Sequence, residues 1–313
     1  MLSSLAVVLE QPQRIALTSL ALDRPGLADV VVETKWSGIS AGTERLLFKG
    51  LMPPFPGMGY PLVPGYENVG RVVDAGRDAG LEIGAEVFVP GARCFGPVRG
   101  LHGGAASHLV TPASRVVRIS PSLRERGVLL ALAATAFHAL GNLSAGAGVL
   151  IVGHGVLGRL LARLAVLAGG EPPVVWEKNP ARAGGAVGYD VKAPEDDTRA
   201  DYPVIFDVSG DPAILDVLIQ RLAPQGVIVL AGFYDRVSFS FPPAFMREAR
   251  IQTAAAWRDG DLAEVVKLVD AGRLSLDGLV THRRPASEAP AAYPIAFDDP
   301  SCLKMVLEWG APA

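Results

Sequence analysis

The stretch VLIVGHGVLGRLLARL, residues 149–164, decides the fold of this chain. Its first four residues are apolar and predict a buried strand, and the apolar spacing from residue 156 onward predicts a helix. Between the two, Gly153, Gly155 and Gly158 form the pattern G-x-G-x-x-G. In this context the first glycine allows a tight turn, the second lets a pyrophosphate approach, and the third lets the helix pack closely on the strand. The stretch therefore predicts a dinucleotide-binding turn.

Further candidate cofactor contacts lie around this turn. Sites of this kind place an acidic residue about 20 positions further on to accept hydrogen bonds from the ribose hydroxyls, and Glu177 stands at that spacing. Because its carboxylate would repel the additional phosphate of NADP, the predicted cofactor is NAD. His154, inside the motif, is interpreted as an exposed turn residue rather than a catalyst. The other candidate cofactor contacts are Val156, Leu157, Thr135, Lys178 and Ser209.

Strand and helix patterns alternate on both sides of the turn, along residues 121–274. Apolar runs predict strands in PVVWEK (173–178), YPVIFDVSG (202–210) and GVIVLAGF (226–233). Helical spacing predicts helices in residues 122–143, 156–170, 212–224 and 261–274. Alternation with nearly continuous apolar strands is typical of a doubly wound parallel sheet, so the fold class is α/β with a Rossmann domain over 121–274.

Residues 1–120 follow a different pattern, rich in Gly, Pro and Val. Short alternating runs in residues 28–38, 67–76 and 85–94 predict a mostly antiparallel β domain. The segment LLFKGLMPPFPGMGYP (46–61) is predicted to be an irregular loop. Residues 275–313 break the strand-helix alternation and are predicted to complete this first domain.

Composition bounds the classes of function. The chain has 313 residues, 19% of them charged, and a net charge of -3, which argues against nucleic acid as a partner. Cys94 and Cys302 form no metal or disulfide pattern and are expected to be free thiols in a reducing compartment. No basic leader and no apolar run of ~18 residues is present, so a cytoplasmic protein is expected. The apolar composition leaves loose association with a membrane surface open.

A second chemical feature is the stretch PLVPGYENVGRVVDAG, residues 61–76. Tyr66 and Glu67 stand where a loop leads into a predicted strand. Such a pair could handle a proton, could lie beside a metal, or could belong to a turn with no chemical role.

The motifs together resemble the medium-chain dehydrogenase/reductase superfamily, across nearly the whole chain. They are SGISAGTE (37–44), VPGYENVGRVVDAG (63–76), GGAASH (103–108), GHGVLG (153–158) and LVTHR (279–283). The resemblance implies a GroES-like catalytic domain, a Rossmann domain and a nicotinamide cofactor. The segment 37–70 looks most like the 3-hydroxyethyl bacteriochlorophyllide a dehydrogenases of bacteriochlorophyll biosynthesis. It implies an NAD-dependent oxidation of the 3-(1-hydroxyethyl) group of a chlorophyllide to 3-acetyl.

Two other functions remain open at this point. Zinc-free members of the superfamily are commonly NADPH-dependent quinone or enone reductases, and a dinucleotide-binding protein without catalytic activity would carry the same glycine motif. A homodimer is an expectation by analogy with the superfamily alone.

The chain departs from the zinc-dependent members at their ligand positions. It has Ser40-Ala41-Gly42 where they have a Cys-His-Thr or similar triplet, and Gly65-Tyr66-Glu67 where they have Gly-His-Glu. The helix before the glycine motif contains no cysteine, and the four-cysteine lobe is absent. His102, His108, His138 and His282 have no ligand-like neighbours. A catalytic zinc needs three suitably placed ligands, so no metal is predicted.

Without zinc, a side chain or water must accept the hydroxyl proton of the substrate. The resemblance places Tyr66 and Glu67 facing the nicotinamide. We predict Tyr66 as hydrogen-bond partner and proton conduit, Glu67 as its electrostatic partner, and Thr43 or Ser40 as orienting groups. His138 is a third candidate acceptor.

The substrate is predicted to lie in the cleft between the two domains, under residues 48–60. The candidate contacts for a flat ring are Phe48, Leu51, Met52, Phe55 and Met58, although these side chains could instead plug the β domain. Candidates for binding its propionate carboxylate are Arg45, Lys49, Arg93 and Arg99.

Overall fold

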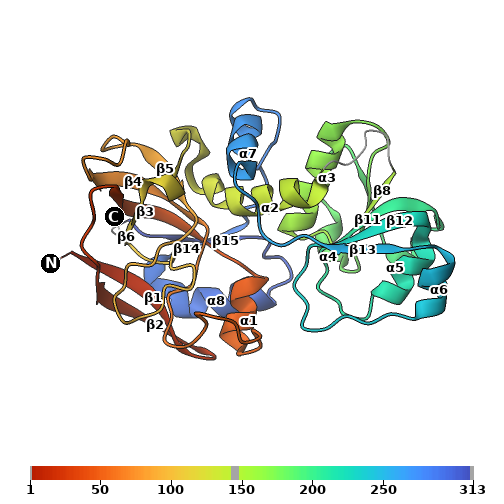
Figure 1. The fold of residues 1–313 in the computed structure, drawn as a ribbon, viewed down its shortest axis with the longest axis horizontal. Coiled ribbons are helices and arrows are strands. Elements are labelled where there is room, and N and C mark those ends of the chain that lie inside the picture. The colour runs from red at the N-terminus through yellow and green to blue at the C-terminus, as the bar shows by residue number, and fades with distance from the viewer. Residues whose placement is uncertain (1, 142–147, 311–313) are drawn as a thin grey trace. The chain divides into compact units, whose positions relative to one another are not determined.

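The computed structural model describes residues 2–141 and 148–310. The chain divides into two compact units, one of Met1–Ala131 with Asp277–Ala313 and the other of Leu132–Leu276. Figure 1 shows the elements of both units.

The first unit is built on antiparallel strands. Its sheet has the order β14-β15-β3-β4-β5-β7, with β6 also paired to β3, and β1 and β2 form a separate hairpin. The strands are β1 (Ser3–Gln11), β2 (Arg14–Ala21), β3 (Asp29–Ile39), β4 (Asn68–Ala75), β5 (Glu86–Val89), β6 (His108–Pro112), β7 (Val117–Arg118), β14 (His282–Pro285) and β15 (Met305–Glu308). Only β14 and β15 pair in parallel within this sheet. Val30, Val31 and Val32 of β3 are all buried, so both faces of the strand are covered at this point.

Short helical elements complete the first unit. They are α1 (Thr43–Lys49), α8 (Ala289–Asp298) and the 3₁₀ turns Ala113–Arg115, Pro121–Leu129 and Ala286–Glu288. The prediction of an irregular loop over 46–61 was wrong for its first residues, because α1 continues to Lys49. Gly50 ends this helix at φ 69°, a conformation that favours glycine, and its N–H bonds the carbonyls of the last turn.

The second unit is a six-stranded parallel sheet, as the sequence predicted. The order is β10-β9-β8-β11-β12-β13, and every adjacent pair is parallel. Its strands are β8 (Val149–Val152), β9 (Val174–Trp176), β10 (Asp190–Lys192), β11 (Tyr202–Asp207), β12 (Leu222–Leu230) and β13 (Arg250–Thr253). Its helical elements are α2 (Leu130–Leu140), which begins in the first unit, α3 (Val156–Ala168), α4 (Pro180–Ala183), the turn Pro194–Asp196, α5 (Leu215–Arg221), α6 (Phe241–Met246) and α7 (Asp261–Asp270). Counted from β8, this is the strand order of a Rossmann fold, in which the chain reverses direction beside the first strand.

The helix predicted over 122–143 is interrupted. Residues Pro121–Leu129 form 3₁₀ turns with a break at Arg124, where φ is 49°, and α2 begins only at Leu130. Residues 142 and 143 lie outside the described part of the chain. The helix predicted over 212–224 ends at Arg221, because Leu222 already pairs with Tyr202 as β12 begins. Strands β10 and β13 were missed because each is short and mostly polar, so neither carries an apolar period.

Both cysteines are free and buried. Among the described residues, no helix is both long enough and apolar enough to cross a membrane.

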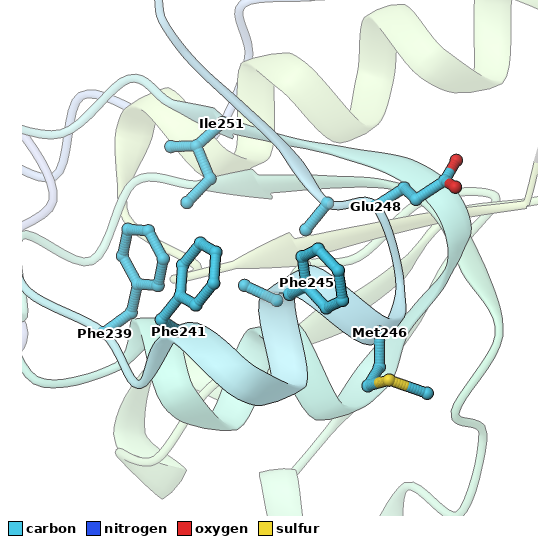
Figure 2. A pocket seen from close by; sticks show the side chains of 8 residues that line it. Phe239, Phe241, Phe245, Met246, Glu248 and Ile251 are labelled. Atoms are coloured by element: carbon cyan, nitrogen blue, oxygen red, sulfur yellow. The ribbon is translucent and has the colours of Figure 1, made fainter.

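An open apolar hollow lies beside α6 and β13. It is lined by Phe239, Phe241, Phe245, Met246 and Ile251, and the rings of Phe241 and Phe245 lie 5.6 Å apart between centroids (Figure 2). Since α6 leads into β13, the hollow lies toward the amino-terminal ends of the strands. The glycine turn follows β8 and lies at the opposite, carboxyl-terminal edge.

Candidate active site

The loop before β4 presents Tyr66 in a defined position. Gly65 has φ 96°, and a Cβ there would lie 2.8 Å from the Ala105 nitrogen, so only glycine fits. The carbonyls of Pro64 and Gly65 accept hydrogen bonds from Ala105 and Gly104 at 2.9 and 2.7 Å. The loop is therefore held to a neighbouring segment immediately before Tyr66.

Tyr66 and Ser40 form the centre of the site. The Tyr66 hydroxyl lies 2.6 Å from Ser40 Oγ, and Tyr66 is half-buried. Burial and the nearby Glu67 carboxylate raise the pKa of Tyr66, whereas hydrogen bonding to Ser40 and Thr43 opposes the rise. The phenol is therefore protonated at neutral pH, and three of the four predicted catalytic side chains lie together.

Glu67, the fourth, points away from solvent and is paired with a lysine that the sequence analysis missed. Lys304 Nζ donates to Glu67 Oε1 and Oε2 at 2.8 and 2.7 Å and to the Ile39 carbonyl at 3.1 Å. The Lys304 side chain is 2% exposed and the Glu67 side chain 0%. Burial raises the pKa of Glu67, and Lys304 counters that shift by favouring the charged carboxylate. Glu67 is therefore out of reach of solvent, and it influences Tyr66 through its negative charge.

A second buried carboxyl, that of Glu44, lies in the first turn of α1 and contacts the backbone of Ser40. Its Oε1 accepts the Ser40 N–H at 3.0 Å, and its Oε2 is buried together with the neighbouring Tyr293 hydroxyl. Burial raises the pKa of Glu44 to about 7, against the stabilising Ser40 N–H. Glu44 thus titrates near neutrality while it holds the backbone of Ser40. Glu44 ends the motif SGISAGTE, but the sequence analysis gave it no role.

His102 also belongs to this site, although the sequence analysis weighed it only as a possible metal ligand. Its ring packs edge-on against Tyr66, with 5.1 Å between centroids. Burial and then Arg93 and Arg115 lower the pKa of His102, so its neutral form is favoured. The predicted acceptor His138 is in the other unit, where it lies 3.2 Å from Asp261.

The donor set at this site does not suit zinc. Ser40 offers a hydroxyl, Tyr66 offers a phenol whose pKa is raised, and both Glu67 oxygens are engaged by Lys304. Zinc in proteins takes thiolate, imidazole or free carboxylate ligands. Among the described residues, no group of three His, Cys, Asp or Glu side chains could hold a metal ion.

The glycine turn of the second unit suits a dinucleotide. Gly153 has φ 107°, and a Cβ at Gly158 would lie 1.8 Å from the Gly153 carbonyl oxygen. A Cβ at Gly155 would meet nothing within 4 Å, so open space lies over the middle of the turn. Helix α3 begins directly afterwards at Val156, followed by Leu157, and directs its first N–H groups toward that space.

Most of the other predicted cofactor residues gather at this edge of the sheet. Glu177 directly follows β9, and its Oε2 and Oε1 accept the N–H groups of His154 and Asn179 at 3.1 and 2.8 Å. Ser209 follows β11, with its Cα 3.5 Å from the Cβ position of Gly153. Lys178 is exposed and lies 4.0 Å from Asp211. Thr135 lies on α2 and stays a prediction.

The five predicted substrate side chains separate into two groups. Phe48, Met52 and Met58 pack in apolar clusters of the first unit, and the Phe48 ring lies 5.6 Å from that of Phe297. Leu51 and Phe55 are 63% and 41% exposed and are available to a ligand.

The four cations predicted for the propionate also differ. Arg45 and Lys49 both pair with Asp298, at 3.9 and 3.3 Å, whereas Arg93 and Arg99 are exposed.

Comparison with known proteins assigns the family. Residues 26–121 match the alcohol dehydrogenase GroES-like domain. The chain is 56% identical over 305 residues to the 2-desacetyl-2-hydroxyethyl bacteriochlorophyllide A dehydrogenase of Rhodobacter capsulatus, with 97% of each chain covered. It is also 56% identical over 314 residues to the protein of that name from Cereibacter sphaeroides, with 98% of this chain and 99% of the other covered.

The chain belongs to the medium-chain dehydrogenase/reductase superfamily. A dehydrogenase from Sinorhizobium meliloti 1021 solved with NADP bound has the same fold, with a TM-score of 0.84, 21% identity, and 99% of this chain and 100% of the other covered. As a dehydrogenase of this superfamily, the chain binds a nicotinamide dinucleotide, and the glycine turn after β8 has the geometry for it.

Gly155 and Gly158 should differ in what they contribute to stability and to cofactor binding. Gly158→Ala places a methyl group against the Gly153 carbonyl and should destabilise the fold by about 1–3 kcal/mol. Gly155→Ala should change stability by less than about 0.5 kcal/mol but weaken cofactor binding, because its methyl group occupies the open space. Thermal unfolding and cofactor titration of both variants would check this, and equal loss of stability would contradict it.

The Lys304–Glu67 pair should dominate the stability of the first unit. Lys304→Met leaves a buried carboxylate without its counter-ion and should cost about 3–5 kcal/mol. Adding Glu67→Gln should recover part of the loss, because no charge then stays buried. Lys49→Met, which breaks an exposed pair, is the control and should cost less than about 1 kcal/mol. Urea unfolding would measure all four proteins.

Glu44 should make stability depend on pH. Its pKa is about 7 in the folded protein and near 4.5 when unfolded, so its stabilising contribution is full below pH 4.5 and is lost as the pH rises toward 7. Glu44→Gln keeps an acceptor for Ser40 and cannot ionise. Its free energy of unfolding, measured with urea, should therefore gain on that of the wild type from pH 5 to pH 8, by about 3 kcal/mol at the upper end. A constant difference across that range would show that Glu44 does not titrate there.

Proposed function

We propose that this enzyme oxidises the 3-(1-hydroxyethyl) group of a bacteriochlorophyllide to a 3-acetyl group, with NAD as the hydride acceptor. The observation that carries the proposal is the 56% identity, over nearly the full length, to two dehydrogenases named for that class of substrate. The Ser40–Tyr66 hydroxyl pair supports it, since an alcohol oxidation must remove a hydroxyl proton.

The reaction removes a hydride from the carbinol carbon and a proton from its oxygen, which leaves the ketone. Bound NAD would take the hydride. We propose that no metal assists, because Ser40, Tyr66 and the lysine-bound Glu67 are poor ligands for zinc. The carbinol carbon adjoins a conjugated macrocycle, which delocalises the positive charge that develops as the hydride leaves.

The proton moves, in this proposal, through hydroxyl groups. The pKa of Tyr66 is raised, so the phenol does not act as a tyrosinate base. A protonated phenol can still relay a proton if it gives its own to Ser40 as it receives one from the substrate, provided that Ser40 releases its hydroxyl proton to water in the same relay. Thr43 helps to orient the substrate oxygen. The negative charge of Glu67 stabilises the proton as it moves between the Tyr66 and Ser40 hydroxyl groups.

We propose NAD rather than NADP because of Glu177. Its two oxygens are held by the N–H groups of His154 and Asn179, and each keeps a lone pair for a ribose hydroxyl. A carboxylate in this position would repel a phosphate on the same ribose.

The exposed side chains of Leu51 and Phe55 are the best supported contacts for the macrocycle. Of the four cations, Arg93 and Arg99 are better candidates for the propionate, because neither is paired with Asp298 as Arg45 and Lys49 are.

Product analysis tests the function directly. The protein, incubated with NAD and a 3-(1-hydroxyethyl) chlorophyllide, should form the 3-acetyl product and one NADH for each product molecule, with lower efficiency on NADP. Tyr66→Phe should lower kcat by roughly 10²-fold or more, the loss expected when proton transfer is impaired. Tyr202→Phe, which removes a buried hydroxyl bonded to Asp197, is the control.

Three results would contradict this proposal. They are reduction of enones with NADPH without alcohol oxidation, loss of activity on removal of stoichiometric zinc, and unchanged kcat in Tyr66→Phe.

A further inference from the structure

His154, the residue between the first two glycines of the turn, is fully buried. The expectation of an exposed turn residue was wrong. The turn directs the imidazole into the protein, where it meets the segment that follows β9.

Both ring nitrogens of His154 have partners on that segment. Nδ1 lies 2.6 Å from the Arg182 carbonyl oxygen, and Nε2 lies 2.8 Å from the Tyr189 hydroxyl. A carbonyl only accepts, so Nδ1 carries a proton. Burial lowers the pKa of His154 and so favours the neutral ring, in which Nε2 accepts from the Tyr189 hydroxyl. Tyr189 is itself only 7% exposed.

Arg159, directly after the motif, joins the same two segments. Its Nε donates to the His154 carbonyl at 3.0 Å, and its Nη2 donates to the Arg182 carbonyl at 2.8 Å. The residue is 5% exposed. The Arg182 carbonyl therefore receives two hydrogen bonds from the glycine-motif region, one from His154 and one from Arg159.

The backbone of His154 connects this cluster to the cofactor site. Its N–H donates to Glu177 Oε2 at 3.1 Å, while the other carboxylate oxygen accepts the Asn179 N–H. Asn179 in turn begins α4, which leads to Arg182. Both groups that fix the Glu177 carboxylate thus belong to segments that the His154 side chain joins.

We propose that His154, assisted by Tyr189 and Arg159, is a positioning residue that fixes the Glu177 carboxylate and so sets the preference for NAD over NADP. This rests on the role of Glu177 in the proposed function. A fixed carboxylate cannot turn away from a ribose phosphate, so its repulsion persists. A mobile one could move aside and would also bind the ribose hydroxyls less well.

The test is a double-mutant cycle on cofactor binding, without substrate. Dissociation constants of NADH and NADPH would be measured by fluorescence for the wild type, His154→Leu, Glu177→Gln and the double variant. His154→Leu should raise the Kd of NADH about tenfold and change that of NADPH by less than about threefold. In the Glu177→Gln background, the same substitution should change either Kd by less than about twofold.

Tyr189→Phe keeps the test open if His154→Leu does not fold. It removes a single hydroxyl and should shift the NADH to NADPH ratio in the same direction by a smaller factor. Tyr202→Phe, a buried tyrosine of the same unit, is the matched control and should leave the ratio unchanged.

Equal weakening of both cofactors by His154→Leu would indicate a structural role only and would overturn the inference. The inference would also be overturned if Glu177→Gln changes the ratio of the two dissociation constants and the effects of His154→Leu and Glu177→Gln simply add in the double variant. If Glu177→Gln leaves the ratio unchanged, the assignment of Glu177 fails and the inference fails with it. Failure to oxidise a chlorophyllide would overturn the proposed function alone, because these measurements contain no substrate.

Discussion

A buried ion pair, Lys304 with Glu67, organises the catalytic unit. Neither side chain is accessible to water, so each charge is tolerable only because the other is within hydrogen-bond distance. Lys304 has three N–H donors and uses them on both Glu67 oxygens and the Ile39 carbonyl. The pair therefore joins the end of β3, the loop before β4 and the residue before β15. Gly38 makes room for it, since a Cβ there would lie 2.1 Å from Glu67 Oε2.

The Lys304–Glu67 pair also affects the position and the pKa of the neighbouring Tyr66. Tyr66 precedes Glu67, so anchoring the carboxylate in the interior leaves the phenol directed at Ser40. The charge of Glu67 also raises the pKa of Tyr66 and keeps the phenol protonated. One arrangement thus holds the hydroxyl pair in place and favours the protonated phenol, which is the form that the proposed relay requires. Glu44 helps to hold Ser40 in place by accepting a hydrogen bond from its N–H group.

Among its described residues, the cofactor unit holds its motif in place without a buried ion pair of this kind. The glycine turn must remain open to a pyrophosphate, so it has few side chains of its own to hold its position. His154 supplies the missing contacts by turning inward, and Arg159 ties the turn to the same carbonyl that His154 contacts. In both units, a buried polar side chain at a motif position holds a neighbour that we propose as a ligand contact.

The amino-acid sequence determined the classes of structure, because apolar period and glycine spacing are local. It was enough to predict β8, the turn and α3, the parallel sheet, and Glu177 as an acidic residue at the end of β9. It also proposed Tyr66, Ser40 and Thr43 as catalytic candidates, since they occupy motif positions, and that role stays a prediction. It could not identify Lys304, which lies 237 positions from Glu67, or the inward turn of His154 toward Tyr189, 35 positions away. Those contacts were decided by the tertiary structure alone, because a buried charge or imidazole takes whichever partner the folded chain brings within hydrogen-bond distance, and no local pattern records that partner.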